Sequence, residues 1–349
     1  MKIQRYIVYG AGAVGSVVGG LLYRAGYATY LVARPAHVEA IRTHGLRLET
    51  PTEKLTLNIP AVSQLAEAAP GAGDVILLSV KATQTATAIA DIARHVLPTT
   101  PVFCLQNGVA NEGTVAKYVT QVYPVLVMFN AILPEPGRAV LTILDFLAVG
   151  RFPKGTDAFT AQVAADLTSA GLPTREHPDV MAVKWGKLIG NLNNALLAVT
   201  DCYWQKAFAT PEMLAMMRAI MDEGLRVLAA AGISPADVTG RFDIRAQVEA
   251  FAARQAEFAD VPPEQRGYPS MWQDLYFRRP ETEVEYLNGE IVRLGERYGI
   301  PTPINRALCD AVRESIQTSK GVGQFPLERL RERIAQLANS PTALDVGRA

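Results

Sequence analysis

The chain of 349 residues is long enough for two domains of ordinary size, each with its own hydrophobic core. Hydrophobic residues make up 49% of it and charged residues 19%, which is typical of a folded globular protein. Lysine plus arginine and aspartate plus glutamate number 34 each, so no net field attracts nucleic acid or an anionic membrane. We find no local basic stripe either, and this argues against a nucleic-acid partner.

The chain shows no sign of export, of a membrane span or of a metal site. Its first residues run straight into a strand and a glycine turn, without the apolar core or cleavage site of a signal peptide. No apolar run approaches the roughly 18 residues that a membrane span needs. The cysteines have neither metal-ligand nor disulfide spacing; they are Cys104, Cys202 and Cys309. We therefore expect a cytoplasmic protein with reduced, buried cysteines and no metal.

The N-terminal half alternates short apolar runs with helical patterns, which predicts a parallel sheet wrapped by helices. The expected strands are residues 6–9, 29–33, 75–80, 102–105 and 125–129, one or two strands within 139–150, and a short one at 172–177. The expected helices are residues 14–24, 82–95, 111–118 and 157–170.

Strand signals almost vanish after about residue 178, and long helical patterns follow. The expected helices are 181–199, one that has Thr210 as N-cap and Pro211 as its first residue and ends at Gly232, and then 280–299, 303–318 and 326–339. We expect an α/β protein with an N-terminal Rossmann-type doubly wound sheet (1–176) and an all-helical C-terminal domain (177–349). The apolar faces of the helical domain also allow a homodimer.

A glycine-rich turn joins the first expected strand to the first helix. Gly10, Gly12 and Gly15 form a GxGxxG in which the first glycine permits the tight turn and the second lets a pyrophosphate approach the backbone. The third allows close packing of helix on strand, and the helix N-terminus, with Ala13 and Val14, faces the phosphates. The alternative is a purely structural turn, but the position within a βαβ unit favours a dinucleotide.

Arg34 ends the second expected strand, where the residue that distinguishes NAD from NADP is found. An acid there binds the ribose 2′-hydroxyl, whereas a guanidinium matches a 2′-phosphate bidentately. Arg34 therefore predicts NADP(H), which would make the chain an oxidoreductase. The alternative is an exposed arginine beside a cofactor that is held in another way.

Reduction of a carbonyl needs a proton donor as well as a hydride. The four histidines are poorly placed for that role: His37 and His44 follow the second strand, His95 lies at a helix end and His177 at the domain boundary.

The helix of residues 181–199 offers a different acid, because it carries polar residues along one face. These residues are Lys184, Lys187, Asn191 and Asn194, at helical spacing, and the rest of the helix is largely apolar. Such a stripe is costly unless it faces a polar cavity or water. A desolvated lysine also has a lowered pKa, which suits a general acid near neutral pH. The alternative is a solvated face of a surface helix.

A second polar segment contains Ser270, Asp274 and Glu283. Glu283 falls in the first turn of the helix that is expected to begin at Pro280. An acid in that position commonly does no more than complement the helix dipole.

Together these motifs resemble the ketopantoate reductase family (2-dehydropantoate 2-reductases) over residues 6 to about 318. Five segments carry the resemblance: the glycine turn with Arg34; Asp74 to Ala82; Leu105 to Gly108 with Glu112; Lys184 to Asn191; and Ser270 to Asp274 with Glu283 to Gly289.

The resemblance implies NADPH-dependent reduction of a 2-oxo acid, 2-dehydropantoate being the leading substrate, in a cleft between the domains. It implies that Lys187 is the general acid and that Glu283 holds the substrate hydroxyl and orients the lysine. Ser270 would bind the substrate carboxylate and Asn191 the substrate, while Lys81 and Asn107 would line the cleft. The family's second helix asparagine is replaced by Ala195, so that Asn194 takes over its contact.

Two other functions stay open. One is another NAD(P)-dependent hydroxy-acid or sugar-acid dehydrogenase of the 6-phosphogluconate-like group, with the same acid and cofactor but a different pocket. The other is an NADP(H) sensor without turnover, which would not need Lys187, Asn191, Ser270 and Glu283.

Overall fold

The computed structural model describes residues 3–236, 249, 253 and 261–339. The chain divides into two compact units, Met1–Met181 and Ala182–Ala349. The division falls within helix α6 (Val180–Asn191), a few residues after the boundary expected from the sequence.

Unit 1 is built on an eight-stranded sheet with the strand order β12-β11-β8-β7-β6-β1-β2-β5. Its strands are β1 (Arg5–Tyr9), β2 (Thr29–Val32), β5 (Ala61–Val62), β6 (Asp74–Leu78), β7 (Val102–Cys104), β8 (Val122–Val127), β11 (Leu147–Val149) and β12 (Thr174–Glu176). All neighbours pair in parallel except β8 and β11. The expected Rossmann-type sheet is confirmed.

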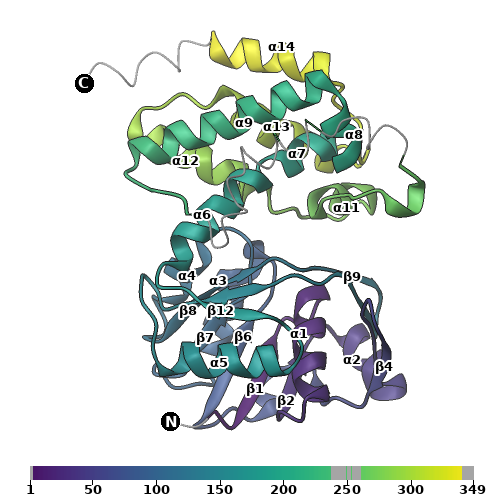
Figure 1. Ribbon diagram of the computed structural model, residues 1–349, viewed down its shortest axis with the longest axis vertical. Coiled ribbons are helices and arrows are strands. Elements are labelled where there is room, and N and C mark those ends of the chain that lie inside the picture. The colour runs from purple at the N-terminus through teal and green to yellow at the C-terminus, as the bar shows by residue number, and fades with distance from the viewer. Residues whose placement is uncertain (1–2, 237–248, 250–252, 254–260, 340–349) are drawn as a thin grey trace. The chain divides into compact units, whose positions relative to one another are not determined.

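Alternate residues of β1 send their side chains to opposite faces of this sheet, as a strand requires. Tyr6 and Val8 pack in one core with helices α1 (Ala13–Arg24) and α5 (Ala158–Ser169). Ile7 packs in the other, with α3 (Thr85–Ile92) and α4 (Asn111–Val115). Both faces are therefore covered by helices, which makes the sheet doubly wound (Figure 1).

A second, four-stranded sheet in unit 1 was not expected, although one of its strands overlaps the segment 139–150, where one or two strands were predicted. Its order is β4-β3-β10-β9, with β3 (Leu46–Glu49), β4 (Lys54–Leu57), β9 (Asn130–Glu135) and β10 (Arg138–Ile143). Helix α1 packs between it and the large sheet. Two adjacent glycines make this possible, because an added Cβ on Gly19 would meet Leu31 and Val8, and one on Gly20 would meet Leu48 and Leu46. The strands are short and half exposed, so they carry little apolar signal.

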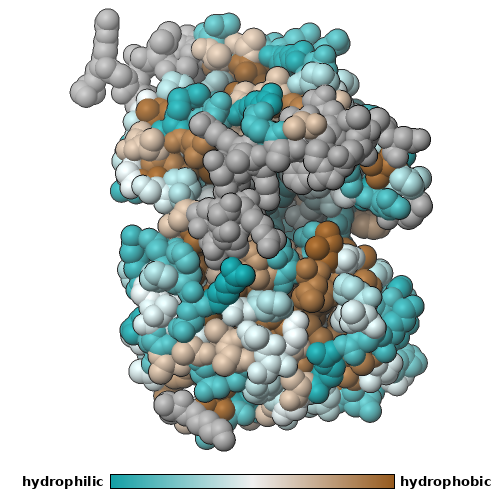
Figure 2. Space-filling model, in the orientation of Figure 1, coloured by the Kyte–Doolittle hydropathy of each residue, from teal (hydrophilic) through white to brown (hydrophobic). Residues whose placement is uncertain are grey.

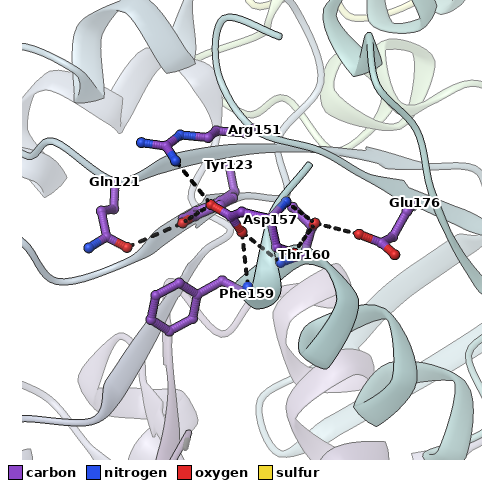
Figure 3. A network of polar contacts seen from close by, with 7 residues as sticks. All are labelled: Gln121, Tyr123, Arg151, Asp157, Phe159, Thr160 and Glu176. Carbon is purple, nitrogen blue, oxygen red and sulfur yellow. Dashed lines mark hydrogen bonds and ion pairs between the residues drawn. The ribbon is translucent and has the colours of Figure 1, made fainter. Parts of the chain in front are cut away.

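The start of α5 shows how unit 1 satisfies its polar groups (Figure 3). Asp157, the N-cap, accepts hydrogen bonds from the backbone N–H groups of Phe159 (2.9 Å) and Thr160 (3.1 Å). Its other oxygen accepts from Tyr123 (2.9 Å) of β8, and the Thr160 hydroxyl contacts Glu176 of β12 at 2.5 Å. The cap thereby ties α5 to two strands of the sheet.

The described part of unit 2 is helical, as expected. Besides α6 it contains α7 (Asn193–Val199), α8 (Trp204–Ala209), α9 (Pro211–Ala230), α11 (Ser270–Tyr276), α12 (Asn288–Tyr298), α13 (Pro303–Gln317) and α14 (Leu327–Ala338). The helix expected to start at Pro211 does so, and Gly232 follows its end with φ 67°. Helices α8 and α11 were not predicted from the sequence, and neither was α2 (Pro35–His44) in unit 1.

Two expected helices need correction. The single helix 181–199 is two helices separated by Leu192, which still has helical angles (φ −56°, ψ −30°). The Asn193 side chain donates to the Gly190 carbonyl (3.3 Å) and so competes with backbone bonding at this point. The helix expected at 280–299 begins only at Asn288, after a 3₁₀ turn at Val284–Tyr286.

The second correction changes how Glu283 is interpreted. It does not lie in the first turn of an α-helix but precedes the 3₁₀ turn, and its carbonyl accepts from the Tyr286 N–H (2.9 Å). Leu287 interrupts the helix with φ −115° and ψ −92°. A helix-dipole role for the carboxylate on α12 is therefore excluded.

The surface and the cysteines agree with the composition. No helix in the described part of the chain is long and apolar enough to cross a membrane. Hydrophilic side chains cover much of the face that Figure 2 shows, and hydrophobic ones form separate patches. Cys104, Cys202 and Cys309 are buried and free of disulfides, as expected. Among the described residues no group of histidine, cysteine and carboxylate side chains could hold a metal ion.

Candidate active site

The glycine turn lies where β1, β2 and β6 meet at their carboxyl ends. Gly10 and Ala11 both donate to the Val32 carbonyl of β2 at 2.9 Å, and the Ser79 hydroxyl, after β6, donates to the Gly10 carbonyl at 2.9 Å. Gly12 is the N-cap of α1, where neither a capping side chain nor a first-turn acid is present. The first N–H groups of α1 therefore offer donors and a positive dipole end to an anion.

The three glycines differ in what a side chain would meet. Gly10 has φ 92°, and an added Cβ would lie 2.4 Å from Val80. On Gly15 it would lie 2.4 Å from Ser79 Oγ and 2.9 Å from the Gly10 carbonyl. On Gly12 the nearest protein atom would be 3.9 Å away. Gly10 and Gly15 are thus required by the fold, whereas the space at Gly12 is open, as a bound pyrophosphate would need.

Arg34 is exposed and is the N-cap of α2, directly after β2. Its guanidinium makes no hydrogen bond or ion pair with the residues that the structure describes. In the described part of the chain no carboxylate pairs with this charge at the end of β2, which suits a phosphate ligand.

His37, one turn after Arg34, was rejected as a proton donor from the sequence, and in the structure it supports the glycine turn. It is buried, its Nδ1 accepts from the Gly137 N–H (2.8 Å), and its Nε2 lies 3.0 Å from Ser16 Oγ. The Ser16 hydroxyl in turn donates to the Ala11 carbonyl (3.2 Å) of the glycine turn. Because Nδ1 accepts, the neutral ring carries its proton on Nε2, and burial together with the charge of Arg34 lowers the pKa of His37.

Lys81 and Asn107 follow the next two strands of the sheet, β6 and β7, and both are partly exposed. The Asn111 side chain donates to the Asn107 carbonyl (2.8 Å) and accepts from Thr85 (2.7 Å), which fixes the backbone after β7. All the predicted cofactor residues therefore lie on the same edge of one sheet, where ligands of open α/β sheets bind.

Unit 2 contains the predicted acid and its carboxylate. Lys187 is half-buried on α6 with Lys184, which is 4% exposed, one turn before it. Burial, and then the charge of Lys184, lower the pKa of Lys187 to about 8, and the negative charge of Glu283 opposes them. The structure thus brings Lys187 and Glu283 into electrostatic contact, although they are far apart in sequence. The solvated-face alternative does not fit Lys184 and Asn194 of the same face, which are 4% and 6% exposed.

The predicted substrate residues of unit 2 differ in exposure. Asn194 is 6% exposed and Asn191 is half-buried, and neither amide hydrogen-bonds to the described residues. Ser270 is exposed as the first residue of α11, which packs against α7. Ala195, where we expected a change from the family pattern, is completely buried.

Comparisons with known proteins place most of the chain in one family. The model described as ketopantoate reductase PanE/ApbA matches residues 6–154, and the model of its C-terminal part matches residues 179–317. A 2-dehydropantoate 2-reductase of Archaeoglobus fulgidus is 32% identical over 314 residues, which cover 90% of this chain and 98% of that protein. A 2-dehydropantoate 2-reductase of Lactococcus lactis is 28% identical over 91% of this chain and 98% of that protein.

Solved structures agree. A PanE/ApbA family ketopantoate reductase from Ralstonia eutropha has a TM-score of 0.79 at 32% identity, covering 90% of this chain and 99% of that one. D-mandelate dehydrogenase, solved with NADH and anilino(oxo)acetate, has a TM-score of 0.77 at 26% identity and the same coverage.

The glycine turn gives a prediction that separates ligand contact from folding. Gly12→Ala should leave the Tm within about 2 °C of the parent, because the protein has room for the methyl group. It should weaken NADPH binding about 10- to 100-fold, the cost of about 1–3 kcal/mol for overpacking a contact. The measurements are thermal melting and a fluorescence titration.

Gly15→Ala is the control, since its Cβ meets the protein itself, and it should lower the Tm clearly. A folded Gly12→Ala variant that binds NADPH like the parent would contradict a pyrophosphate at this position.

Proposed function

We propose that this chain, which belongs to the ketopantoate reductase family, reduces a 2-oxo acid to a 2-hydroxy acid with NADPH, and that 2-dehydropantoate is its leading substrate. Membership makes it an oxidoreductase acting on a CH–OH group. A nucleotide cofactor is supported by the relatives and by the open glycine turn of unit 1.

The observation that carries the proposal is the half-buried amino group of Lys187 beside Glu283. When bound, the nicotinamide supplies a hydride to carbon C2 of the oxo acid. Negative charge then develops on the C2 oxygen and must be neutralised by a proton. With a pKa of about 8, Lys187 is mostly protonated at neutral pH and still acidic enough to give the proton up. Lys187 is therefore assigned as the general acid.

Glu283 has two tasks in this proposal. Its carboxylate holds the hydroxyl of the substrate and orients the lysine. Its charge also raises the pKa of Lys187 against burial and against Lys184, and so keeps the acid loaded with its proton. Ser270 binds the substrate carboxylate, and the amides of Asn191 and Asn194, which have no internal partner in the described chain, contact the substrate.

On the nucleotide side, unit 1 binds the cofactor through Gly10, Gly12, Ala13, Val14 and Gly15. Lys81 and Asn107 complete that edge of the sheet, with Asn107 also in reach of the substrate. Arg34, with its unneutralised charge, favours NADPH over NADH. The D-mandelate dehydrogenase structures contain NADH, so in this proposal the preference for NADPH rests on residues such as Arg34 and not on the fold.

A second candidate is a dehydrogenase for a larger hydroxy acid, with the same acid and cofactor residues. The observation in its favour is the likeness to D-mandelate dehydrogenase, which was solved with anilino(oxo)acetate. The replacement at Ala195 leaves this chain a smaller side chain than the asparagine of the family pattern. An NADP(H) sensor is disfavoured, because binding alone needs no lysine of lowered pKa.

A panel of acids tests the function. Purified protein with NADPH should oxidise the cofactor fastest with 2-dehydropantoate, and more slowly with 2-oxoisovalerate and phenylglyoxylate. NADP⁺ with 6-phosphogluconate tests the sugar-acid alternative. Fastest turnover of phenylglyoxylate would favour the second candidate, and turnover of none of these acids would favour the sensor.

The general acid is tested by substitution. Lys187→Ala should lower kcat at least about 100-fold, the usual scale for an acid–base group.

The pH dependence should reveal the pair. Because the acid must carry its proton, kcat/KM should fall as pH rises through about 8. Lys184→Met removes a like charge and should move this limb to higher pH, whereas Glu283→Gln removes the opposite charge and should move it to lower pH. The profile is measured from initial rates, with circular dichroism as the folding control. An identical limb in all three proteins would exclude Lys187 as its source.

Cofactor choice is tested at Arg34. Arg34→Asp should raise KM for NADPH about 10- to 100-fold, as expected for losing a charge-assisted bond of about 1.5–3 kcal/mol, and change KM for NADH far less. Arg34→Gln is the matched control without a new charge and should lie between. Equal effects on both cofactors would remove Arg34 from this role.

A further inference from the structure

Three polar side chains that the catalytic proposal does not use form a hydrogen-bonded chain inside unit 2. They are Glu223 of α9, Asn288 at the start of α12 and Asn305 of α13, and each is completely buried. Polar side chains are rarely buried so completely unless they have hydrogen-bond partners, so these three side chains and their partners call for an explanation.

Asn288 is the central link. Its Nδ2 donates both hydrogens, one to the Leu192 carbonyl (3.0 Å) and one to Asn305 Oδ1 (2.9 Å). Since two acceptors face this nitrogen, the amide cannot be turned to put its oxygen there. Its Oδ1 is buried and has no hydrogen-bond partner in the described part of the chain. The side chain thus makes these two bonds while leaving one acceptor unsatisfied.

Glu223 orients the next link. One carboxylate oxygen accepts from the backbone N–H and from Nδ2 of Asn305, both at 2.8 Å, and the other from the Ile304 N–H at 3.1 Å. The carboxylate therefore caps the N-terminus of α13 and turns Nδ2 of Asn305 toward itself. Oδ1 of Asn305 is left to face Asn288.

The packing brings the same elements together. Gly224, next to Glu223, lies against α6, where an added Cβ would be 2.8 Å from Leu192 Cδ1 and 2.9 Å from Ile189 Cδ1. Helix α9 can approach the α6–α7 junction this closely only because residue 224 has no side chain.

These hydrogen bonds lead to the two segments that carry the proposed acid, Lys187, and its carboxylate, Glu283. Lys187 lies five positions before Leu192 (187 to 192), and Glu283 lies five before Asn288 (283 to 288). The turn between Glu283 and Asn288 is closed by the Tyr286 N–H donating to Glu283 and the Leu287 N–H donating to Val284. The bond from the Asn288 side chain to the Leu192 carbonyl thus joins the short segment after Glu283 to the residue that directly follows helix α6, which carries Lys187.

We propose that Asn288, held by Asn305 and Glu223, is a positioning residue that clamps the Glu283 turn to Leu192, at the C-terminal end of helix α6, and so keeps the Glu283 carboxylate beside Lys187. This rests on the proposed function of the pair. Asn288 touches neither reacting group and acts through the placement of Glu283.

The test compares Asn288→Ala with the parent and with Val312→Ala, a buried residue of α13 outside the chain of bonds. Asn288→Ala should lower kcat at least about tenfold and move the basic limb of kcat/KM to lower pH, because Lys187 loses the nearby negative charge. KM for NADPH should stay unchanged. Val312→Ala should lower the Tm and leave the limb in place.

A double-mutant cycle distinguishes positioning from general destabilisation. In a Glu283→Gln background, Asn288→Ala should shift the limb no further, since the charge that it places is already absent. An equal, additional shift would overturn the proposal. If Asn288→Ala does not fold, the near-isosteric Glu223→Gln takes its place, with a smaller shift in the same direction expected.

Failure of this proposal and failure of the proposed function look different. If Lys187→Ala retains near-normal kcat, the function of the pair is wrong. If Lys187→Ala is inactive but Asn288→Ala and Glu223→Gln keep the parent limb and kcat, the clamp alone is wrong. The protonation of Lys187 can also be followed without turnover, by the pH dependence of its acetylation measured by mass spectrometry, which should change in Asn288→Ala as the limb does.

Discussion

Withdrawal of one amino group from water is the constraint on which unit 2 depends. Burial and a neighbouring lysine both push Lys187 toward its neutral form, and the carboxylate of Glu283 acts in the other direction. The balance leaves a lysine that holds its proton at neutral pH but holds it weakly. Such a balance is sensitive to the distance between the two charges. A fold that relies on it must fix the Glu283 turn, which belongs to no α-helix.

Unit 1 gathers hydrogen-bond donors and positive charge at one place, the carboxyl ends of its central strands. The first turn of α1 has neither a capping side chain nor an acid, and Arg34 has no carboxylate partner among the described residues. Both features leave positive charge or backbone donors available to a ligand. Together, at one edge of one sheet, they suit the binding of an anionic ligand. The family to which the chain belongs gives that ligand its chemical identity in our proposal.

The sequence predicted those features that depend on neighbouring residues. Apolar runs punctuated by glycine and proline predicted the strands of the large sheet to within a few residues, except the two-residue strand β5, and the spacing of Gly10, Gly12 and Gly15 located the turn. Features that depend on distant partners were missed. The interruption at Leu192 involves Asn288, 96 positions away, and the burial of His37 involves Gly137, 100 positions away.

The site shows the same division between local and distant effects. Helical spacing put Lys187 on a polar stripe, but its electrostatic partner comes from a loop that the sequence had assigned to a helix because Pro280 suggested a start. Of the four-stranded sheet, β10 overlaps the segment 139–150, where one or two strands were expected. The sheet itself was missed because its strands come from two separate parts of unit 1 and are half exposed.

That small sheet has a consequence for how the chain can change. Helix α1 is held from both sides, by the large sheet through Gly19 and by the small one through Gly20. The helix therefore has little freedom to slide or tilt. The position of its N-terminus is set by its packing on the two sheets and not by the ligand at the glycine turn. Arg34, in contrast, is an exposed residue at the beginning of a short helix. Nucleotide preference is thereby separable from nucleotide docking: the former can drift by single exchanges at the surface, while the latter is inherited with the fold.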